Sequence, residues 1–273
     1  MNFFNKLLLV WLTACLPLLS SAVPYKNFVI LIASYNNEQY VEQNILSAFQ
    51  DYPEEHYRII FVNDGSKDRT LSMAANIVMH FQKQHLVTIF SNTVRRGALY
   101  NHYWAIHQHI KDDEIVVILD GDDQLANEDV LTYLNTMYLC NDIWLTYGQF
   151  RHISNNSIGF NQAIPTDIIR NNAFREWTHI PSHLRTFYAK LYKNINLEDL
   201  TINGTFLEMC ADMAAMLPMI EQARDHFKFI PKVLYLYNDQ NPISDHIKSA
   251  ELQKNIDLHV RSLPAYKPLD KLF

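Results

Sequence analysis

The chain has 273 residues, of which 48% are hydrophobic and 19% are charged, and these proportions exclude a largely disordered protein. Its formal net charge is −6, because 29 acidic residues outnumber 23 basic ones. An acidic chain has no electrostatic footprint for nucleic acid, so we expect no nucleic-acid partner. The 6 glycines exclude a collagen-like chain, and the 3 cysteines are too few for a disulfide framework.

Residues 1–22 have the composition of an export signal. Lys6 is the only charge, an apolar run follows over residues 7–19, and small residues lead to Ala22. The pattern predicts a signal peptide cleaved after Ala22, since the run is shorter than the roughly 20 residues of a membrane span. An uncleaved anchor and a buried helix are the alternatives. The protein is therefore expected to be exported or membrane-associated, with membrane contact through the N-terminus.

Cys140 and Cys210 remain after such a cleavage. A single disulfide between them would require an oxidising compartment. We favour two buried free thiols, because spacing along the chain does not show that two cysteines lie close together.

From residue 26 to about 125, apolar runs alternate with segments of helical spacing. A run bounded by polar residues is typical of a strand that is buried on both faces. Strands are predicted at residues 28–33, 58–62, 86–90 and 115–119, and helices at residues 38–50, 68–84 and 97–110. Four strands separated by three helices predict a parallel sheet with right-handed crossovers.

The alternation is looser after residue 125. We expect a helix at 129–140, a strand at 144–150, an irregular segment at 151–200, a helix at 205–226 that Pro218 bends or divides, and a strand at 229–237. Residues 23–273 are expected to form a single domain, with a nucleotide-binding half at 26–125 and an acceptor half at 126–273.

Polar residues follow three of the predicted strands, and ligands of open α/β sheets bind beyond these carboxyl ends. Asp120, Asp122 and Asp123 follow the fourth strand, and three carboxylates of this kind suit Mg²⁺ or Mn²⁺ with a diphosphate completing the shell. A solvated acidic turn is the alternative. Asp64, after the second strand, is a candidate to accept a hydrogen bond from a nucleobase or ribose, or else a helix cap.

Several well-known catalytic motifs do not occur in the chain. There is no GxGxxG, no GxxxxGK[ST] and no GxSxG sequence. Their absence argues against a dinucleotide dehydrogenase, a P-loop enzyme and an ordinary α/β-hydrolase.

Four segments share an order and spacing with a known family: residues 32–38 (IASYNNE), 62–70 (VNDGSKDRT), 92–101 (NTVRRGALYN) and 119–123 (LDGDD). Together they resemble the family 2 glycosyltransferases of GT-A fold. The resemblance implies an α/β fold of GT-A type, with a Rossmann-like, mostly parallel sheet flanked by helices. It also implies inverting transfer of a sugar from a nucleotide-sugar donor to a hydroxyl of a glycan, lipid or protein acceptor, with Mn²⁺ or Mg²⁺ on the donor diphosphate.

The resemblance also implies roles for individual residues. The sequence has Ala33 where the family often has Pro and Asn63 where it often has Asp, and it lacks the QxxRW signature of processive synthases, which favours transfer of a single sugar. Donor-binding residues are implied at Ser34, Tyr35, Asn36, Glu38, Asp64, Gly97 and Asp120, and metal ligands at Asp120, Asp122 and Asp123.

The general base is expected in the acceptor half. In the family an Asp, often preceded by Glu, opens a helix after the acceptor loop, and Asp212 resembles it although Ala211 stands in place of the Glu. An exposed helix charge is the alternative for Asp212. Glu208 is the rival base, since it lies four residues earlier and so on the same face of the expected helix.

Other candidates carry less specific signals. Trp177 and His183 belong to an aromatic segment that could stack on a sugar, and Arg185 could pair with diphosphate, although aromatic core and surface charge explain them equally well. His246 and Lys248 are weaker candidates for the metal and the leaving phosphate, and the Arg95–Arg96 pair is typical of a solvated loop. A non-catalytic nucleotide- or carbohydrate-binding protein and a nucleotidyltransferase are the alternative functions.

Overall fold

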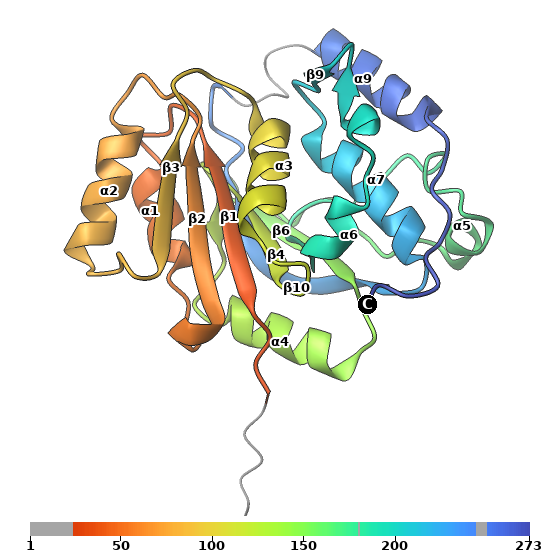
Figure 1. Ribbon diagram of the computed structural model, residues 1–273, viewed down its shortest axis with the longest axis horizontal. Helices are drawn as coiled ribbons and strands as arrows, with labels where there is room; N and C mark the ends of the chain where they lie inside the picture. Colours follow the sequence, from red (N-terminus) through yellow and green to blue (C-terminus); the bar gives the residue numbers. More distant parts are fainter. Residues whose placement is uncertain (1–23, 180, 244–249) are drawn as a thin grey trace, which may run out of the picture.

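A computed structural model describes residues 24–179, 181–243 and 250–273. It shows an eight-stranded sheet in the order β3-β2-β1-β4-β7-β6-β10-β5, with helices on both faces (Figure 1). The strands of this sheet are β1 Phe28–Ser34, β2 Tyr57–Asn63, β3 Val87–Ser91, β4 Ile115–Asp120, β5 Gln124–Leu125, β6 Leu145–His152, β7 Arg185–Tyr188 and β10 Phe227–Tyr237. The mostly parallel α/β sheet predicted from the sequence is confirmed.

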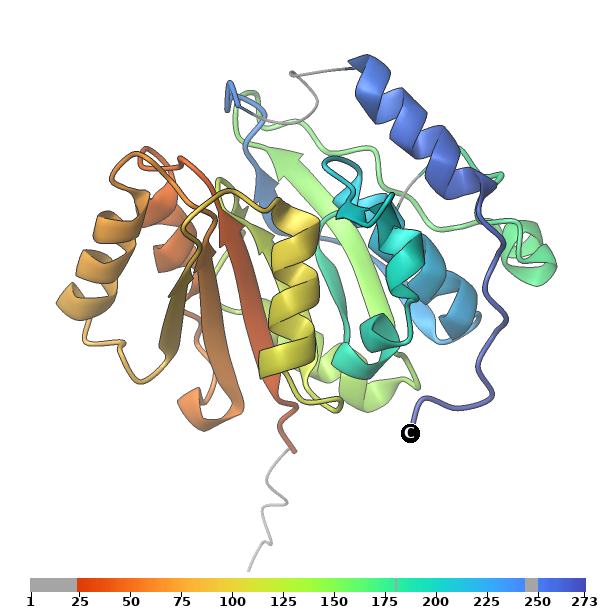
Figure 2. The same ribbon diagram turned by 45° about the horizontal axis from the view of Figure 1, so that its top comes forward.

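The first half forms from long apolar runs. β1 pairs in parallel with β2 and β4, and β2 with β3, so their carboxyl ends share one edge of the sheet. Residues 28–32 are almost fully buried, as expected for a strand covered on both faces. Helices α1 and α2 cover one face, and α3 covers the other (Figures 1 and 2). Their bounds are α1 Val41–Ala48, α2 Thr70–His80 and α3 Ala98–His109, and α4 follows at Val130–Cys140.

The predicted irregular segment at 151–200 contains regular structure. It holds α5 Thr166–Asn171, β7, α6 Ala189–Lys193 and a short 3₁₀ helix at Leu197–Leu200. β7 is antiparallel to both β4 and β6, so it joins the two halves into one sheet. The strand has only four residues, and its polar Arg185 and Thr186 are buried, so it shows neither an apolar run nor the usual alternation.

The helix expected at 205–226 is shorter than predicted. Residues 205–206 form β9 (Thr205–Phe206), which pairs with β8 (Thr201–Ile202), and α7 begins only at Ala211 and runs to Ala223. Pro218 lies inside α7 and does not divide it. Cys210 precedes the helix with a left-handed φ of 59°, which stops any helix from extending back to Glu208. The prediction that Glu208 and Asp212 share one helix face is therefore wrong.

The C-terminal segment is tied to α7 by a buried ion pair. Arg175 donates from Nε and Nη2 to the Glu221 carboxylate at 2.6 and 2.9 Å, and from Nη1 to the main-chain oxygen of Val260 at 2.5 Å. The main-chain N–H of Tyr266 also donates to Glu221. This set of bonds, the C-terminal clamp, holds α9 (Ala250–Ser262) and the following chain over α7 (Figures 1 and 2).

Glu221→Ala is expected to destabilise the fold by about 3–5 kcal/mol, because it leaves the buried Arg175 guanidinium without its counter-charge. Urea unfolding followed by circular dichroism measures the loss. Glu176→Ala is the control, since Glu176 is exposed and should change stability by less than about 0.5 kcal/mol. Equal losses in the two variants would show that the ion pair does not stabilise this region.

Some sequence predictions fall outside the described residues. The signal segment at 1–22 and the candidates His246 and Lys248 are among them, and they stay predictions. None of the helices within the described ranges is long and apolar enough to cross a bilayer. Cys140 and Cys210 form no disulfide with each other, and the Cys210 thiol lies 3.6 Å from the main-chain oxygen of Gln253. The prediction that both thiols are buried is wrong, because Cys140 is exposed and Cys210 is only partly buried.

Candidate functional site

A cavity of about 300 Å³ lies at the carboxyl edge of the sheet, and we call it the central cavity. Its walls come from the ends of β1 and β4, the start of α3, the segment entering β7, the start of α7 and the end of β10. Of the predicted site residues, Tyr35, Asp120, Asp122, Asp123 and Asp212 line it. Side chains from both halves of the chain therefore converge on one volume.

The three carboxylates after β4 have different partners. Asp120 Oδ2 accepts a hydrogen bond from Arg185 Nη2 at 2.8 Å, and Asp122 Oδ2 accepts one from Asn241 Nδ2 at 2.6 Å. Asp123 is fully buried and accepts from the Tyr235 hydroxyl at 2.6 Å and from the main chain of residue 238 at 2.7 Å. Polar contacts thus fix each carboxylate separately.

Electrostatics set the protonation of this group. Burial raises the pKa of Asp123 well above its usual value, and the charges of Asp122 and Asp120 add to the effect. Burial alone would also raise the pKa of Asp120, but the charge and hydrogen bond of Arg185, together with the charges of His183 and His102, outweigh burial and the pKa is lowered. If all three carboxylates are ionised, Arg185 neutralises one of their three negative charges. A divalent cation would balance the two negative charges that remain.

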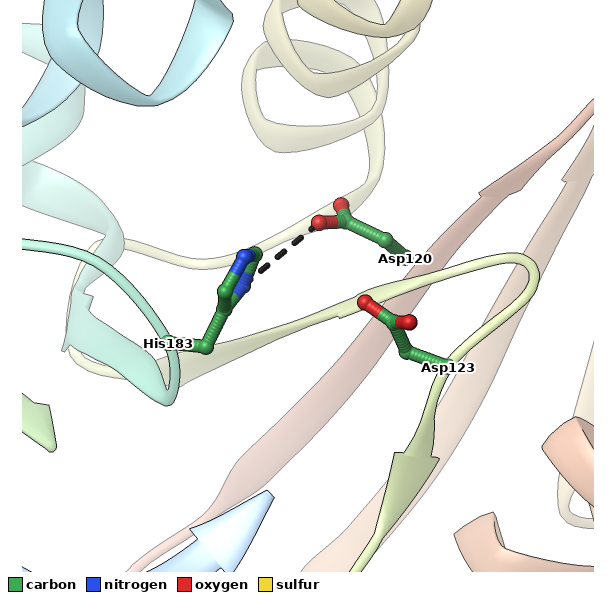
Figure 3. Close-up of side chains that lie close together, drawn as sticks. All are labelled: Asp120, Asp123 and His183. Carbon is green, nitrogen blue, oxygen red and sulfur yellow. Dashed lines mark ion pairs between the residues drawn. The ribbon is translucent and has the colours of Figure 1, made fainter. Parts of the chain in front are cut away.

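His183 completes this cluster from the other half of the chain. Ligand atoms of Asp120, Asp123 and His183 all lie within 4.8 Å of one another, and Figure 3 shows the three side chains pointing toward a common point. The His183 ring stacks on Tyr235 with centroids 4.5 Å apart, and its Nδ1 accepts or donates no hydrogen bond among the described residues. Burial and the charge of Arg185 lower the pKa of His183 to about 4, so the ring is neutral at pH 7, as a metal ligand must be.

Sequence reasoning did not find His183 as a metal ligand. The residue lies just before β7, whose pairing with β4 brings it beside the acidic turn. A signal for that short strand would have placed Arg185 beside β4, and with it the chain segment that carries His183.

Asp64 lies beside the central cavity but does not line it. Its Oδ1 accepts from Asn92 Nδ2 and from the main-chain N–H of Arg96, and its Oδ2 accepts from the N–H of Gly97, all at 2.8 Å. Gly97 has a φ of 89°, a conformation suited to glycine, and α3 begins directly after it. Asp64 therefore fixes the loop that carries Arg95, whose guanidinium lies 4.5 Å from the centre of the Tyr35 ring.

The loop after β1 is held mainly by contacts with the loop after β2. Asn36 accepts from the N–H of Lys67 through its side chain, and the Glu38 carboxylate accepts from the N–H of Arg69. Ser34 is buried against the turn at Gly121, where an added Cβ would lie only 2.6 Å from Ser34 Oγ. Among these predicted donor-binding residues only Tyr35 lines the cavity, and Ser34, Asn36 and Glu38 shape the loop that presents it.

The two candidate bases are separated in space. Asp212 is in the first turn of α7, lines the central cavity and interacts electrostatically with His183 and Arg185. Glu208 is exposed and lines a second cavity, of about 690 Å³, together with Arg95, Arg96 and Gly97. We call this second space the arginine cavity.

Trp177 does not line these cavities. Its ring packs against the hydrophobic core, and its main-chain oxygen accepts a hydrogen bond from Arg261 Nη1 at 2.7 Å. Trp177 is therefore an aromatic core residue, which was the alternative to a sugar-stacking role. Arg185, in contrast, is a buried site residue rather than a surface charge.

Comparison with known proteins identifies the family. Residues 29–197 match the sequence profile of Glycosyl transferase family 2, which is more than half of the chain. The chain belongs to glycosyl transferase family 2. No curated protein sequence gives a significant match.

Solved structures share the fold. S. aureus TarS residues 1–349 in complex with UDP-GlcNAc has 18% identity and a TM-score of 0.60, over 82% of this chain and 61% of that one. The mannosyltransferase PcManGT from Pyrobaculum calidifontis in complex with GDP-Man and Mn²⁺ has 19% identity and a TM-score of 0.57, over 80% of this chain and 58% of that one. The family 2 chain thus spans about 60% of the length of these structures, and they confirm the GT-A fold.

Proposed function

We propose that the protein moves one sugar, with inversion, from a nucleotide-sugar donor to an acceptor hydroxyl, with a divalent cation on the donor diphosphate. The observation that supports this most is the central cavity, which combines the acidic cluster after β4 with a separate carboxylate, Asp212, at the start of α7. An inverting transfer needs these two groups on opposite sides of the reacting carbon, one for the leaving diphosphate and one for the acceptor.

The residues of the acidic cluster fit a cation of the Mg²⁺ or Mn²⁺ type. Asp120 and Asp123 supply hard oxygen ligands, His183 supplies a neutral nitrogen with no hydrogen-bond partner in the described ranges, and Asp122 lines the same cavity. A bound cation supplies charge stabilisation for the departing diphosphate. Arg185 holds Asp120 in place and adds a positive charge on the same side.

The chain's own residues account for the proton in the transfer. The acceptor oxygen attacks the anomeric carbon from the face opposite the diphosphate, and its proton passes to the Asp212 carboxylate. The new C–O bond forms as the bond between the anomeric carbon and the phosphate oxygen breaks, and the nucleoside diphosphate leaves with that electron pair. One attack from the opposite face inverts the configuration at the anomeric carbon.

Donor positioning is assigned to the other predicted residues. Tyr35, with Arg95 beside its ring, is suited to stack on the base, and Asp64 and Gly97 support that arrangement through the loop before α3. Ser34, Asn36 and Glu38 shape the loop that carries Tyr35, through contacts within that loop and with the loop after β2.

Asp64→Ala is expected to weaken nucleotide binding by about 10-fold or more, with or without Mn²⁺, because it removes three hydrogen bonds to a charged group that fix the loop before α3. Isothermal titration with UDP and GDP, in Mn²⁺ and in EDTA, measures the effect. Asp113→Ala, at an exposed position far from the loop, should leave both affinities unchanged. A loss seen only in Mn²⁺ would contradict the role assigned to Asp64.

A panel of UDP- and GDP-sugars tests the function as a whole. Release of nucleoside diphosphate that requires Mn²⁺ or Mg²⁺ and stops in EDTA is the expected result, and proton NMR of the first product should show an inverted anomeric linkage. Binding without turnover would favour a non-catalytic carbohydrate- or nucleotide-binding protein. Pyrophosphate release from a nucleoside triphosphate would favour a nucleotidyltransferase.

A further inference from the structure

A third cavity, of about 610 Å³, meets the central cavity at Asp212. Cys210, Asp212 and Gln253 line both spaces, so Asp212 stands between them. The remaining lining side chains are Phe160, Thr178, His179, Lys254 and Asp257. We call this space the α9 cavity, because α9 supplies one of its walls.

The position of the α9 cavity relative to Asp212 indicates what it could hold. A general base must contact the acceptor hydroxyl, so the acceptor has to approach from a space that reaches the base. The arginine cavity does not meet this condition, because it touches the central cavity through Arg95 and does not include Asp212. Of the cavities beside the central one, the α9 cavity opens onto the base.

The walls of the α9 cavity come from the start of α7 and from three other segments of the chain. Phe160 is on the loop after β6, Thr178 and His179 precede β7, and Lys254 is on α9. The C-terminal clamp holds α9 over α7, as Figure 2 shows, and Arg261 of α9 also donates to the main-chain oxygens of Arg175 and Trp177. The cavity is therefore built by an anchored helix rather than by a single surface loop.

The lining chemistry matches a neutral sugar. Phe160 is 60% exposed, and it packs on Phe150 edge to face at 5.4 Å, so much of this aromatic side chain contacts solvent. Around it lie the hydroxyl of Thr178, the imidazole of His179 and the amide of Gln253, which can form hydrogen bonds with sugar hydroxyls. A sugar ring, with its apolar face and the hydroxyl groups at its edge, complements such a surface. The aromatic side chain packs on the apolar face, and the polar groups form hydrogen bonds with the hydroxyls.

The charges in the α9 cavity are nearly balanced, which argues against an anionic acceptor. Asp257 is paired with Arg261 at 3.0 Å, and the remaining charged lining residues, Lys254 and Asp212, have opposite charges. No arginine lines this cavity, in contrast to the two in the arginine cavity. The described lining residues also favour a sugar over a lipid chain, since Phe160 is the only large apolar side chain among them.

We propose that the α9 cavity is the acceptor subsite and that it binds a neutral sugar residue of a glycan, stacked on Phe160, with one hydroxyl directed to Asp212. The proposal rests on the transferase activity proposed above. It assigns the acceptor to the carbohydrate class, and it makes Phe160 a residue that determines acceptor affinity without contacting the donor.

The test uses the full chain, Mn²⁺ and the donor that the nucleotide-sugar panel identifies, with immobilised glycans, lipids and peptides as acceptor probes. Transfer to neutral glycans is expected. For the best glycan, Phe160→Ala should raise the acceptor KM by about 10-fold or more, as the loss of stacking predicts, while Phe160→Tyr restores most of the affinity. Donor hydrolysis without acceptor should be the same in wild type and both variants.

One control variant and three contrary outcomes complete the test of the α9 cavity. Ile158→Ala removes a neighbouring side chain that is also exposed but does not line the cavity, and it should leave the acceptor KM unchanged. Transfer only to lipids or peptides, or an unchanged KM in Phe160→Ala, would overturn the assignment of the α9 cavity. Absence of donor hydrolysis in the wild type would instead overturn the proposed function.

Discussion

Asp212→Asn is expected to lower kcat by roughly 100-fold or more, the usual contribution of a general base, with little change in donor affinity. Asparagine keeps the side-chain oxygen that accepts from the N–H of Met213, so the start of α7 should be preserved. The carboxylate lies in the first turn of a 13-residue helix, where the positive end of the helix dipole favours an anion. Steady-state kinetics with saturating acceptor, together with donor titration, separate the two effects.

Glu208→Gln is the matched control, because it makes the same chemical change at an exposed carboxylate outside the central cavity. It should cost much less activity than Asp212→Asn. The reverse order would make Glu208 the base, and full activity in both variants would mean that the acceptor-side carboxylate lies elsewhere.

The fold of the first half, residues 26–125, could be predicted from the sequence because its local signals agree with one another. β1, β2 and β4 are long apolar runs that each end in polar residues, and a parallel sheet brings those ends to one edge whatever the details of packing. The acidic turn at 120–123 was therefore found together with its place in the site.

The second half shows the limit of the same reasoning. His183 and Arg185 reach the acidic turn through β7, a strand of four residues whose antiparallel pairing with β4 depends on tertiary contacts rather than on local pattern. The contacts of Asp64 were also not predictable, because two of its three partners are main-chain N–H groups that only a folded loop presents. Glu208 was placed on a helix because residues 205–210 carry no signal for the turn at Cys210.

Sequence and structure differ on the place of Asp122 in the proposed cation site. The resemblance makes Asp122 a metal ligand, whereas the tightest grouping of ligand atoms in the described residues joins Asp120 and Asp123 to His183. Asp122 lines the same cavity, and its Oδ2 is 2.6 Å from Asn241 Nδ2. Separate variants at Asp122 and His183 can therefore show which side chains hold the cation.

Asp122→Asn is expected to reduce Mn²⁺-dependent turnover by about 100-fold or more, because it removes a proposed anionic ligand of the cation. Loss of a residue that only supports a metal ligand typically costs about 10- to 100-fold. An amide oxygen can still accept from Asn241, so the turn should stay folded, and circular dichroism checks this. Mn²⁺ affinity, measured by electron paramagnetic resonance in the presence of UDP, should fall in parallel. Asp113→Asn, which removes one exposed charge elsewhere, should change neither quantity.

His183→Ala supplies the second half of the same experiment. If His183 is a ligand, Mn²⁺ affinity falls in this variant as well, because a neutral imidazole donor is lost from the cluster. A fall in His183→Ala with unchanged affinity in Asp122→Asn would move the cation to Asp120, Asp123 and His183 and leave Asp122 outside its ligands. Unchanged Mn²⁺ affinity and turnover in both variants would contradict a cation at this cluster, and Arg185 would then be the nearest positive charge available to the leaving diphosphate.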